Sequence, residues 1–405
     1  MPALVPRIKL AVTAASSGAA SAWSALWTFP SMLLSAFLVA WGAEAAQFLI
    51  SQGLALAILA WLQTLPEFAV EAVIAWHAGH DAPSCFVAAP PPGCTSHLAI
   101  ANFTGAIRLL VGLGWPMIYA VSAVNARRRG TRPGPITLEP HHAVEVLATV
   151  PPLAYFVWVW YKGSLGVVDA VVLLAMYAAY LAVIWRLPAE DEEGLVDAPL
   201  VSRWAFTRRG PWRGVAITGL FVAGGGLIYF TAHPFLESML ALAATLGVSQ
   251  FVFVQWVAPF ISEFPEKVSA FQWASRTGKA PMAMMNMMSS NINQWTVLAA
   301  MIPLAFSLAR GVPAALPFDG PQRAEILLTI MQSVVAVLLL LDLKFEWWNA
   351  LALFVLWLLQ FLFPDWRIDV TWAYAIWAAL LILSWPWSRP SAPRAFMGLM
   401  RTPRH

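Results

Sequence analysis

Charged side chains are scarce in this sequence. Asp, Glu, Lys and Arg make up 11% of its 405 residues, whereas hydrophobic residues make up 60% and the mean hydropathy is +0.68. A soluble domain carries about 25% charged residues, so the composition excludes an ordinary soluble protein and indicates a polytopic membrane protein. The formal net charge is only +3, and the excess arginine lies between the apolar runs, so we expect no nucleic-acid partner.

Cysteine is scarcer still, with Cys85 and Cys94 as the only two in the sequence. They flank three consecutive prolines, 90–92, in what we expect to be one loop. A loop in an oxidising compartment would permit a disulfide between them, whereas a reducing compartment would keep two unpaired thiols. The sequence leaves both outcomes open.

Recognisable catalytic motifs are missing as well. The sequence has no HExxH-type metal motif, no phosphate-binding loop and no nucleophile–base pair. We therefore expect that the protein is not an enzyme and binds no cofactor. An intramembrane hydrolase or transferase that uses paired carboxylates as acid and base stays as an alternative.

Long apolar runs are what the sequence has in abundance. A helix of about 20 apolar residues spans the hydrocarbon core of a bilayer. Such runs lie near residues 28–50, 54–78, 97–121, 144–161, 166–186, 214–243, 247–274, 283–308, 324–342, 345–363 and 367–388. We therefore predict an all-α polytopic membrane protein with about 10–11 transmembrane helices.

A polar interruption divides these runs into two groups. The predicted organisation is an N-terminal segment 1–27, a first membrane half 28–186, a cytoplasmic loop 187–213, a second membrane half 214–388 and a basic C-terminal tail 389–405.

Arginine and lysine are concentrated in four segments between or after the runs. They are Arg127, Arg128, Arg129 and Arg132; Arg203, Arg208, Arg209 and Arg213; Arg276 and Lys279; and Arg389, Arg394, Arg401 and Arg404. Cytoplasmic loops of membrane proteins carry an excess of these residues. We therefore expect an integral protein of a bacterial inner (plasma) membrane, with the N-terminus outside and the central loop and C-terminus in the cytoplasm.

The run 246–266 carries charge where a membrane segment ordinarily carries none. It continues without a turn residue into Glu263, Pro265 and Glu266, and charge at membrane depth is costly. Pro265 removes a backbone donor and frees a carbonyl about one turn earlier. Broken helices with polar groups at membrane depth are typical of the ion sites of secondary transporters.

A second copy of this motif lies in the first half. Residues 62–67, LQTLPE, match residues 261–266, ISEFPE, and each apolar run ends in Pro-Glu. Asn102 and Asn286 then recur on the span that follows each copy. Because the copies lie on the second and seventh runs, they cross the membrane in opposite directions, and we predict two halves of inverted topology whose motifs meet near the bilayer midplane. The repeats extend over about 53–121 and 245–308.

At these motifs the chain resembles the sodium/calcium exchanger family of the calcium/cation antiporter superfamily, as a divergent prokaryotic-type member. That family carries a Gly-Thr-Ser-Leu-Pro-Glu signature in each repeat and a Gly-Asn-x-x-Gly-Ser-Asn-Ile-x-Asn/Asp signature on the next helix. Segments 63–67 and 262–266 are similar to the first signature, and segment 286–292 is similar to the second. The resemblance covers most of the chain and implies two five-helix halves, a cytoplasmic central loop and one extra span.

Several positions depart from the family pattern. Leu62 and Ile261 replace the signature glycine, and Glu263 replaces the signature serine of the second repeat. Leu110 stands at the late Asn or Asp of the first repeat, with Arg108 two positions earlier. These departures bear on which ions are bound.

Oxygen-bearing side chains of both repeats form the predicted cation site. Carboxylate, hydroxyl and amide oxygens are hard ligands that suit Na⁺ or Ca²⁺. The candidate cation-binding residues are Glu67, Glu266, Glu263, Thr64, Ser262, Asn102, Asn291, Asn286 and Glu71, with Glu67 and Glu266 as the central metal ligands. Arg108 and Lys267 are candidate charge-compensating residues. Four carboxylates minus these two cations leave two negative charges, which one Ca²⁺, two Na⁺ or two protons would neutralise.

The motifs predict a secondary antiporter that works by alternating access and exchanges Na⁺ or H⁺ for Ca²⁺ or a similar cation. If Arg108 occupies an ion position, Na⁺/H⁺ exchange with Arg108 as a built-in cation is the alternative. An alternative of another class is an intramembrane enzyme or a non-transporting scaffold. The expected partners are inorganic cations and the lipid bilayer, with Na⁺, Ca²⁺ or H⁺ transported rather than held as cofactors. The sequence sets no oligomeric state.

Overall fold

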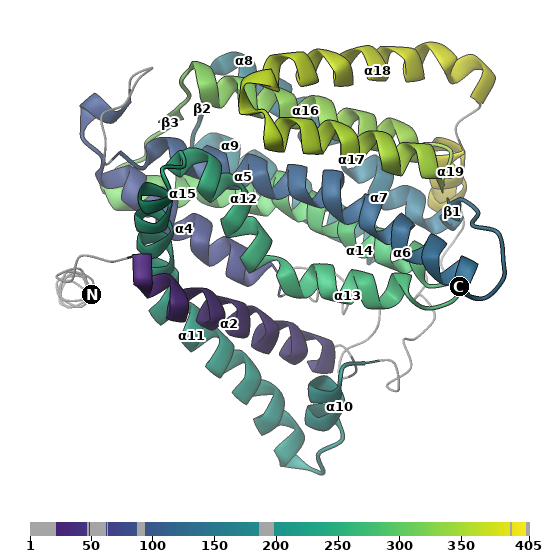
Figure 1. Ribbon diagram of the computed structural model, residues 1–405, viewed down its shortest axis with the longest axis horizontal. Coiled ribbons are helices and arrows are strands. Elements are labelled where there is room, and N and C mark those ends of the chain that lie inside the picture. The colour runs from purple at the N-terminus through teal and green to yellow at the C-terminus, as the bar shows by residue number, and fades with distance from the viewer. Residues whose placement is uncertain are drawn as a thin grey trace.

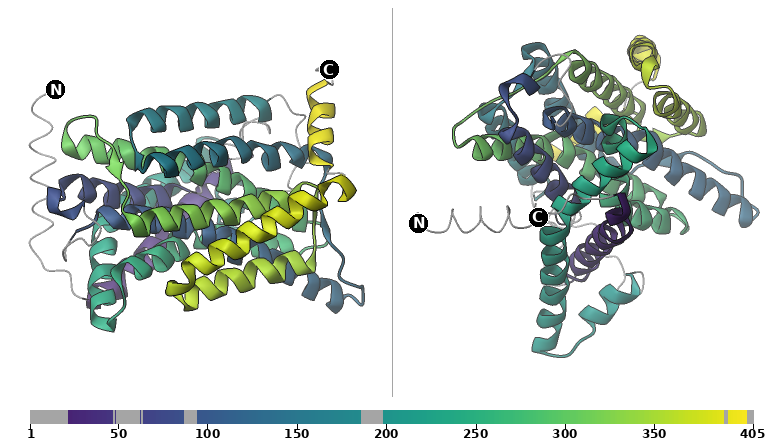
Figure 2. Two further views of the ribbon diagram at one scale, coloured as in Figure 1. Left: turned by 90° about the horizontal axis from the view of Figure 1, so that it is seen from above. Right: turned by 60° about the vertical axis from the view of Figure 1, so that its left-hand side comes forward.

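The structure, a computed structural model, describes residues 22–46, 48, 62, 64–86, 94–185, 198–388 and 391–401. These residues form a bundle of helices, most of which run along a common direction (Figures 1 and 2). The expected start of the second span, 54–61, lies outside the described residues, as do Gln63, Arg389 and Arg404.

The described first half consists of five helices or helix pairs, α2, α4, α5–α6, α7–α8 and α9, with short elements between them. In order they are a 3₁₀ turn Ala22–Ser24, α2 Ala25–Ala46, α4 Leu65–His80, a 3₁₀ turn Pro83–Cys85, α5 Ser96–Leu109, a π-helical turn Leu110–Gly114, α6 Trp115–Arg128, β1 Ile136–Thr137, a 3₁₀ turn Pro140–His142, α7 Ala143–Ala148, α8 Val150–Lys162, β2 Ser164–Leu165 and α9 Val167–Ile184. The short helix α10, Leu200–Phe206, then lies between the halves.

The second half repeats much of this order. Its elements are α11 Pro211–Leu246, α12 Gln250–Ser262, α13 Phe264–Ala274, α14 Ala280–Asn293, a π-helical turn Gln294–Leu298, α15 Ala299–Arg310, β3 Leu316–Pro317, α16 Gly320–Leu340, β4 Lys344–Phe345, α17 Trp347–Leu362, a 3₁₀ turn Pro364–Trp366, α18 Arg367–Ser388 and α19 Ala392–Arg401.

The prediction of an all-α polytopic membrane protein is confirmed. Within the described residues, eight helical stretches are long and apolar enough to cross a bilayer, and α12 and α17 are shorter apolar helices. The expected spans outside those eight coincide with α4, with α12 followed by α13, and with α17. They fall below full membrane length partly because the chain breaks between α12 and α13.

Two pairs of short strands show that the halves have inverted topology. β1 precedes the span α7–α8 and β2 follows it, just as β3 precedes the span α16 and β4 follows it. β1 pairs antiparallel with β4, and β2 pairs antiparallel with β3. β1 lies at one end of the bundle and β2 and β3 lie at the other (Figure 1). Because the equivalent strands β1 and β3 are therefore at opposite ends, the second half runs upside down relative to the first.

The π-helical turns mark the same position in each repeat. One begins at Leu110 and the other at Gln294, and each start lies the same distance, from 102 to 110 and from 286 to 294, after the repeated asparagine. π-helical turns within α-helices are rare and frequently occur at functional sites. Their recurrence supports the alignment of Asn102 with Asn286.

Helices α2 and α11 lie side by side along one edge of the bundle (Figures 1 and 2). Gly224 is a point of close approach, because a Cβ there would lie 2.8 Å from Val39 Cγ2 and 3.1 Å from the Ser35 carbonyl oxygen. α11 runs unbroken for 36 residues, which at about 1.5 Å per residue exceeds the ~30 Å hydrocarbon core. Its length therefore requires tilting or an end that extends beyond the bilayer core.

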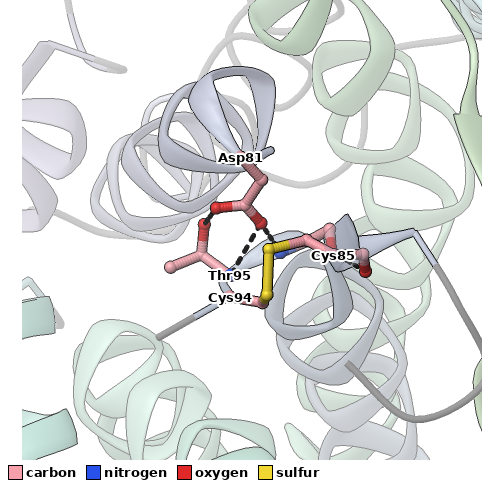
Figure 3. The surroundings of a disulfide bond; sticks show 5 residues. Asp81, Cys85, Cys94 and Thr95 are labelled. Carbon is pink, nitrogen blue, oxygen red and sulfur yellow. Dashed lines mark hydrogen bonds between the residues drawn. A yellow bond between two sulfur atoms is a disulfide. The ribbon is translucent and has the colours of Figure 1, made fainter. Parts of the chain in front are cut away.

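A disulfide joins Cys85 and Cys94, whose Cα atoms are 5.5 Å apart. Asp81 lies beside it and orders the same loop (Figure 3), since its Oδ2 accepts hydrogen bonds of 2.7 Å from the backbone nitrogens of Thr95 and Ser96. These nitrogens belong to the N-terminus of α5, where a carboxylate is stabilised by the helix dipole. The loop therefore fixes the end of α4 against the start of α5.

Candidate cation site

Both Pro-Glu pairs lie at the start of a helix. Pro66 is in the first turn of α4 and Pro265 is in the first turn of α13, where the missing backbone N–H costs little. Glu67 and Glu266 therefore stand in first turns, next to the positive end of each helix dipole. In the second half α12 has already ended, so Glu263 alone separates α12 from α13.

Three carboxyl groups meet at this break. Glu67, Glu263 and Glu266 are each at most 3% exposed, although Glu67 comes from the opposite half of the chain. Gln294 Nε2 donates to Glu263 Oε1 at 2.9 Å and to Glu67 Oε1 at 3.2 Å. The one amide group therefore bridges Glu67 and Glu263.

A buried lysine belongs to the same cluster. Lys267 Nζ forms an ion pair with Glu263 Oε2 at 2.5 Å, and the two side chains are 7% and 1% exposed. The residues are four apart, which brings them to the same face of the broken helix. The structure thus places one positive charge among the three carboxyl groups.

Helix α14 adds amide and hydroxyl groups to the cluster. Asn286, Ser290 and Gln294 are four residues apart and share a helical face, and Ser290 and Gln294 are buried. Several buried oxygens of these segments have no hydrogen-bond partner, namely Glu266 Oε1, Gln294 Oε1 and Asn291 Oδ1. Such oxygens are costly to bury, and a cation is one species that would satisfy them. Among the described residues, no three His, Cys, Asp or Glu side chains are placed to hold a metal ion by themselves.

The remaining predicted ligands lie around this cluster rather than in it. The Ser262 hydroxyl donates to a backbone carbonyl one turn earlier in α12. Glu71, one turn further along α4, accepts a hydrogen bond of 2.6 Å from Asn102 Nδ2. Glu71 Oε1 and Asn102 Oδ1 have no hydrogen-bond partner. This pair is therefore a second buried polar group with unsatisfied oxygens. Thr64 is buried directly before α4.

Arg108 lies in a different polar network. Its Nη2 pairs with Glu325 Oε2 of α16 at 2.5 Å, and its Nη1 donates to Gln360 Oε1 of α17 at 2.9 Å. Glu325 Oε1 pairs in turn with Arg367 Nε of α18 at 2.5 Å. The guanidinium group also lies 5.1 Å from the Trp256 ring centre. The prediction that Arg108 compensates charge in the cation site therefore finds no support in its placement.

Two members of these networks were missed at the level of sequence. Glu325 is a single carboxylate near the start of an apolar run, and an isolated intramembrane charge signals a buried partner. Ser290 lies within the segment 286–292 that resembles the family signature but was not among the predicted ligands, although it lies four residues after the repeated Asn286. Helical spacing from that asparagine would have identified it.

A pocket of about 560 Å³ lies between α2, α10 and α13. It reaches Pro265, the residue before Glu266, and Ser269 one turn later. Ser269 donates to Glu44 Oε1 at 3.2 Å, and Ser202 of α10 donates to Glu44 Oε2 at 3.0 Å. The pocket therefore leads from the segment between the two halves toward the start of α13.

The inverted halves and the helix broken at a Pro-Glu motif define a polytopic membrane protein with the architecture of a secondary transporter. Comparison with known proteins makes the assignment specific. The model of the family "Sodium/calcium exchanger protein" matches residues 17–186 and 216–364. The chain therefore belongs to the sodium/calcium exchanger protein family.

Two solved structures share the fold. The crystal structure of the H⁺/Ca²⁺ exchanger CAX is 29% identical, with a TM-score of 0.84 over 97% of this chain and 95% of that chain. The sodium-calcium exchanger NCX_Mj is 18% identical, with a TM-score of 0.53 over 84% of this chain and 98% of that chain. No curated protein sequence matches the chain significantly.

Proposed function

We propose that the protein is a secondary antiporter that exchanges Ca²⁺, or a similar cation, for protons at a site built from its two Pro-Glu motifs. Glu67 and Glu266 act as the metal ligands, supported by oxygens of α14 and by carbonyls near the helix breaks. Alternating access carries this site between the two sides of the membrane. Asn286 and Asn291, on the same helix α14, are the amide ligands of the proposed site.

The observation that carries this proposal is the meeting of Glu67 and Glu266 with Glu263 in one buried cluster. These residues are almost fully buried and come from helix starts in opposite halves. Carboxylates crowded in a low-dielectric site repel one another, so the cluster is unfavourable unless cations or protons neutralise it. A site of that kind binds either species and releases one when it takes the other.

The proton is favoured as the counter-ion by two observations. Gln294 Nε2 bridges Glu67 and Glu263, so two carboxyl groups are held close together in a buried site, where protonation relieves their repulsion. The H⁺/Ca²⁺ exchanger CAX also resembles this chain over nearly its full length, whereas NCX_Mj shares the fold alone. Na⁺ remains the counter-ion to be distinguished by experiment. Na⁺/H⁺ exchange through Arg108 loses its support because Glu325 pairs with that arginine.

The arginine clusters and the disulfide support the membrane orientation. The Cys85–Cys94 disulfide fits an oxidising compartment, so we place that loop outside the cell. The loop between α6 and β1, the segment around α10 and the loop between α13 and α14 then face the cytoplasm, in line with their arginines. The N-terminus lies outside and the C-terminus inside, in a plasma membrane of the prokaryotic type.

Transport by purified protein in proteoliposomes tests the proposal. We expect ⁴⁵Ca²⁺ uptake to follow an imposed pH gradient and to be unaffected by an imposed Na⁺ gradient. Glu67→Gln and Glu266→Gln should each lower uptake at least a hundredfold, because each removes a charged ligand. Uptake driven by Na⁺ instead of H⁺ would identify the other counter-ion.

A matched control is available on α11. Glu237→Gln changes a half-buried carboxylate that pairs with His233 at 3.8 Å, away from the cluster, and should leave uptake within about twofold of wild type. Wild-type protein without any cation flux, or full uptake by Glu67→Gln and Glu266→Gln, would refute the proposed site.

A further inference from the structure

The Glu263–Lys267 ion pair lies inside the carboxyl cluster and is fully enclosed by protein. Its atoms are 2.5 Å apart, and the side chains are 1% and 7% exposed. Lys267 directly follows Glu266 in the sequence, and its partner Glu263 shares the Gln294 amide with Glu67. A lysine at this position therefore adds a positive charge among the groups of the proposed site.

Glu263 has both of its oxygens already engaged. Oε2 accepts from Lys267 Nζ, and Oε1 accepts from Gln294 Nε2 at 2.9 Å. Glu266 differs, since its Oε1 is buried without a hydrogen-bond partner. The two glutamates, three residues apart, are therefore in different states: Glu266 has an oxygen available for a cation and Glu263 does not.

We propose that Lys267 is a tethered counter-charge that removes Glu263 from ion exchange and fixes the charge capacity of the site at two. The inference rests on the proposed function, because it assigns roles within the same cluster. Glu263 is then a partner of Lys267 rather than a ligand of the transported ion.

Charge counting shows what this pair does. Three carboxylates and one ammonium group leave two negative charges, so the site is neutral with one Ca²⁺ and neutral again with two protons. A net charge within the bilayer is unfavourable, and a site that is neutral in both loaded forms moves no charge across the membrane. The pair therefore predicts exchange of two protons for each Ca²⁺ that does not respond to membrane potential.

Removing either member alone should unbalance the site in opposite directions. Glu263→Gln leaves Lys267 without its partner, so the site keeps one net negative charge and Ca²⁺ uptake should fall at least tenfold. Lys267→Met leaves three carboxylates, so a third proton should be exchanged for each Ca²⁺. Its uptake should then become sensitive to a potential imposed with K⁺ and valinomycin.

Removing both members together is the decisive variant. Glu263→Gln/Lys267→Met deletes one negative and one positive charge, so the capacity returns to two. We expect its ⁴⁵Ca²⁺ uptake to recover at least fivefold relative to Glu263→Gln and to be insensitive to potential. Lys267→Arg, which keeps the charge, should also remain insensitive to potential.

A double variant as inactive as Glu263→Gln would overturn the inference, because Glu263 would then be a ligand. Potential-insensitive uptake by Lys267→Met with two protons per Ca²⁺ would overturn it as well. If Lys267→Met does not fold, the comparison of Glu263→Gln with the double variant decides the question alone. Active Glu67→Gln and Glu266→Gln would instead refute the proposed function, so the two failures are distinguishable.

Discussion

Glu325 is predicted to be the most sensitive charged residue outside the cation site. It pairs at 2.5 Å with both Arg108 and Arg367, and its side chain is fully buried. Glu325→Gln leaves two guanidinium groups facing each other without an anion, and breaking a buried pair in this way costs about 3–5 kcal/mol. At about 2.1 cal/mol/K of unfolding entropy per residue, 405 residues give about 0.85 kcal/mol/K. The melting temperature in detergent should therefore fall by about 4–6 °C.

Arg108→Met should be milder, because it leaves the Glu325–Arg367 pair intact. It removes the contact to Glu325 Oε2 and the hydrogen bond to Gln360 Oε1, but Glu325 stays neutralised by Arg367, and each unsatisfied buried acceptor costs about 1–3 kcal/mol. Thermal unfolding followed by tryptophan fluorescence gives the order of the two variants, with the exposed Arg127→Met as control. Protons exchanged per Ca²⁺ should be unchanged in Arg108→Met. An altered ion ratio at an unaltered melting temperature would refute this reasoning and return Arg108 to the transport site.

Three further predictions follow from packing and pairing. Gly105→Ala should prevent stable folding, since its Cβ would lie 1.8 Å from the Gln255 carbonyl oxygen of α12, whereas Gly225→Ala on α11 meets nothing within 4 Å and should leave the yield of monodisperse protein unchanged. Cys85→Ser/Cys94→Ser should lower stability by about 2–3 kcal/mol for a loop of this length, and reductant should lower the melting temperature of wild type but not of the variant. The loss of Ca²⁺ uptake caused by Glu71→Gln should be at least ten times smaller than the loss caused by Glu67→Gln, because Glu71 pairs with Asn102 instead of joining the three-carboxyl cluster. Equal losses in the two variants would show that Glu71 is a ligand.

The fold was largely predictable because its signals are local. Runs of apolar residues place the spans, and the Pro66-Glu67 and Pro265-Glu266 pairs place the helix starts to within a residue. The inverted topology followed from the repeat, because its copies lie on the second and seventh of the predicted runs and therefore cross the membrane in opposite directions. Helix length was less predictable, since the run 247–274 is divided into α12 of 13 residues and α13 of 11 residues.

Pairing between distant helices was the part that sequence could not supply. Arg108 and Glu325 are more than two hundred residues apart, and their ion pair depends on α5 lying against α16. Lys267, in contrast, pairs with Glu263 across one helical turn, so its partner follows from spacing. Side-chain position within a repeat therefore indicates candidates, but the three-dimensional neighbours decide which of them share a site.

The two strand pairs also have a consequence for the origin of the chain. β1, the first strand of the first half, pairs with β4, the second strand of the second half, and β2 pairs with β3 in the reciprocal way. This is the isologous arrangement of a two-fold symmetric dimer, in which each surface is self-complementary. A single half would leave both strand edges unpaired, and only a copy inserted the other way up could complete them. The present chain thus has the geometry of an antiparallel homodimer whose two subunits have been joined through the segment around α10.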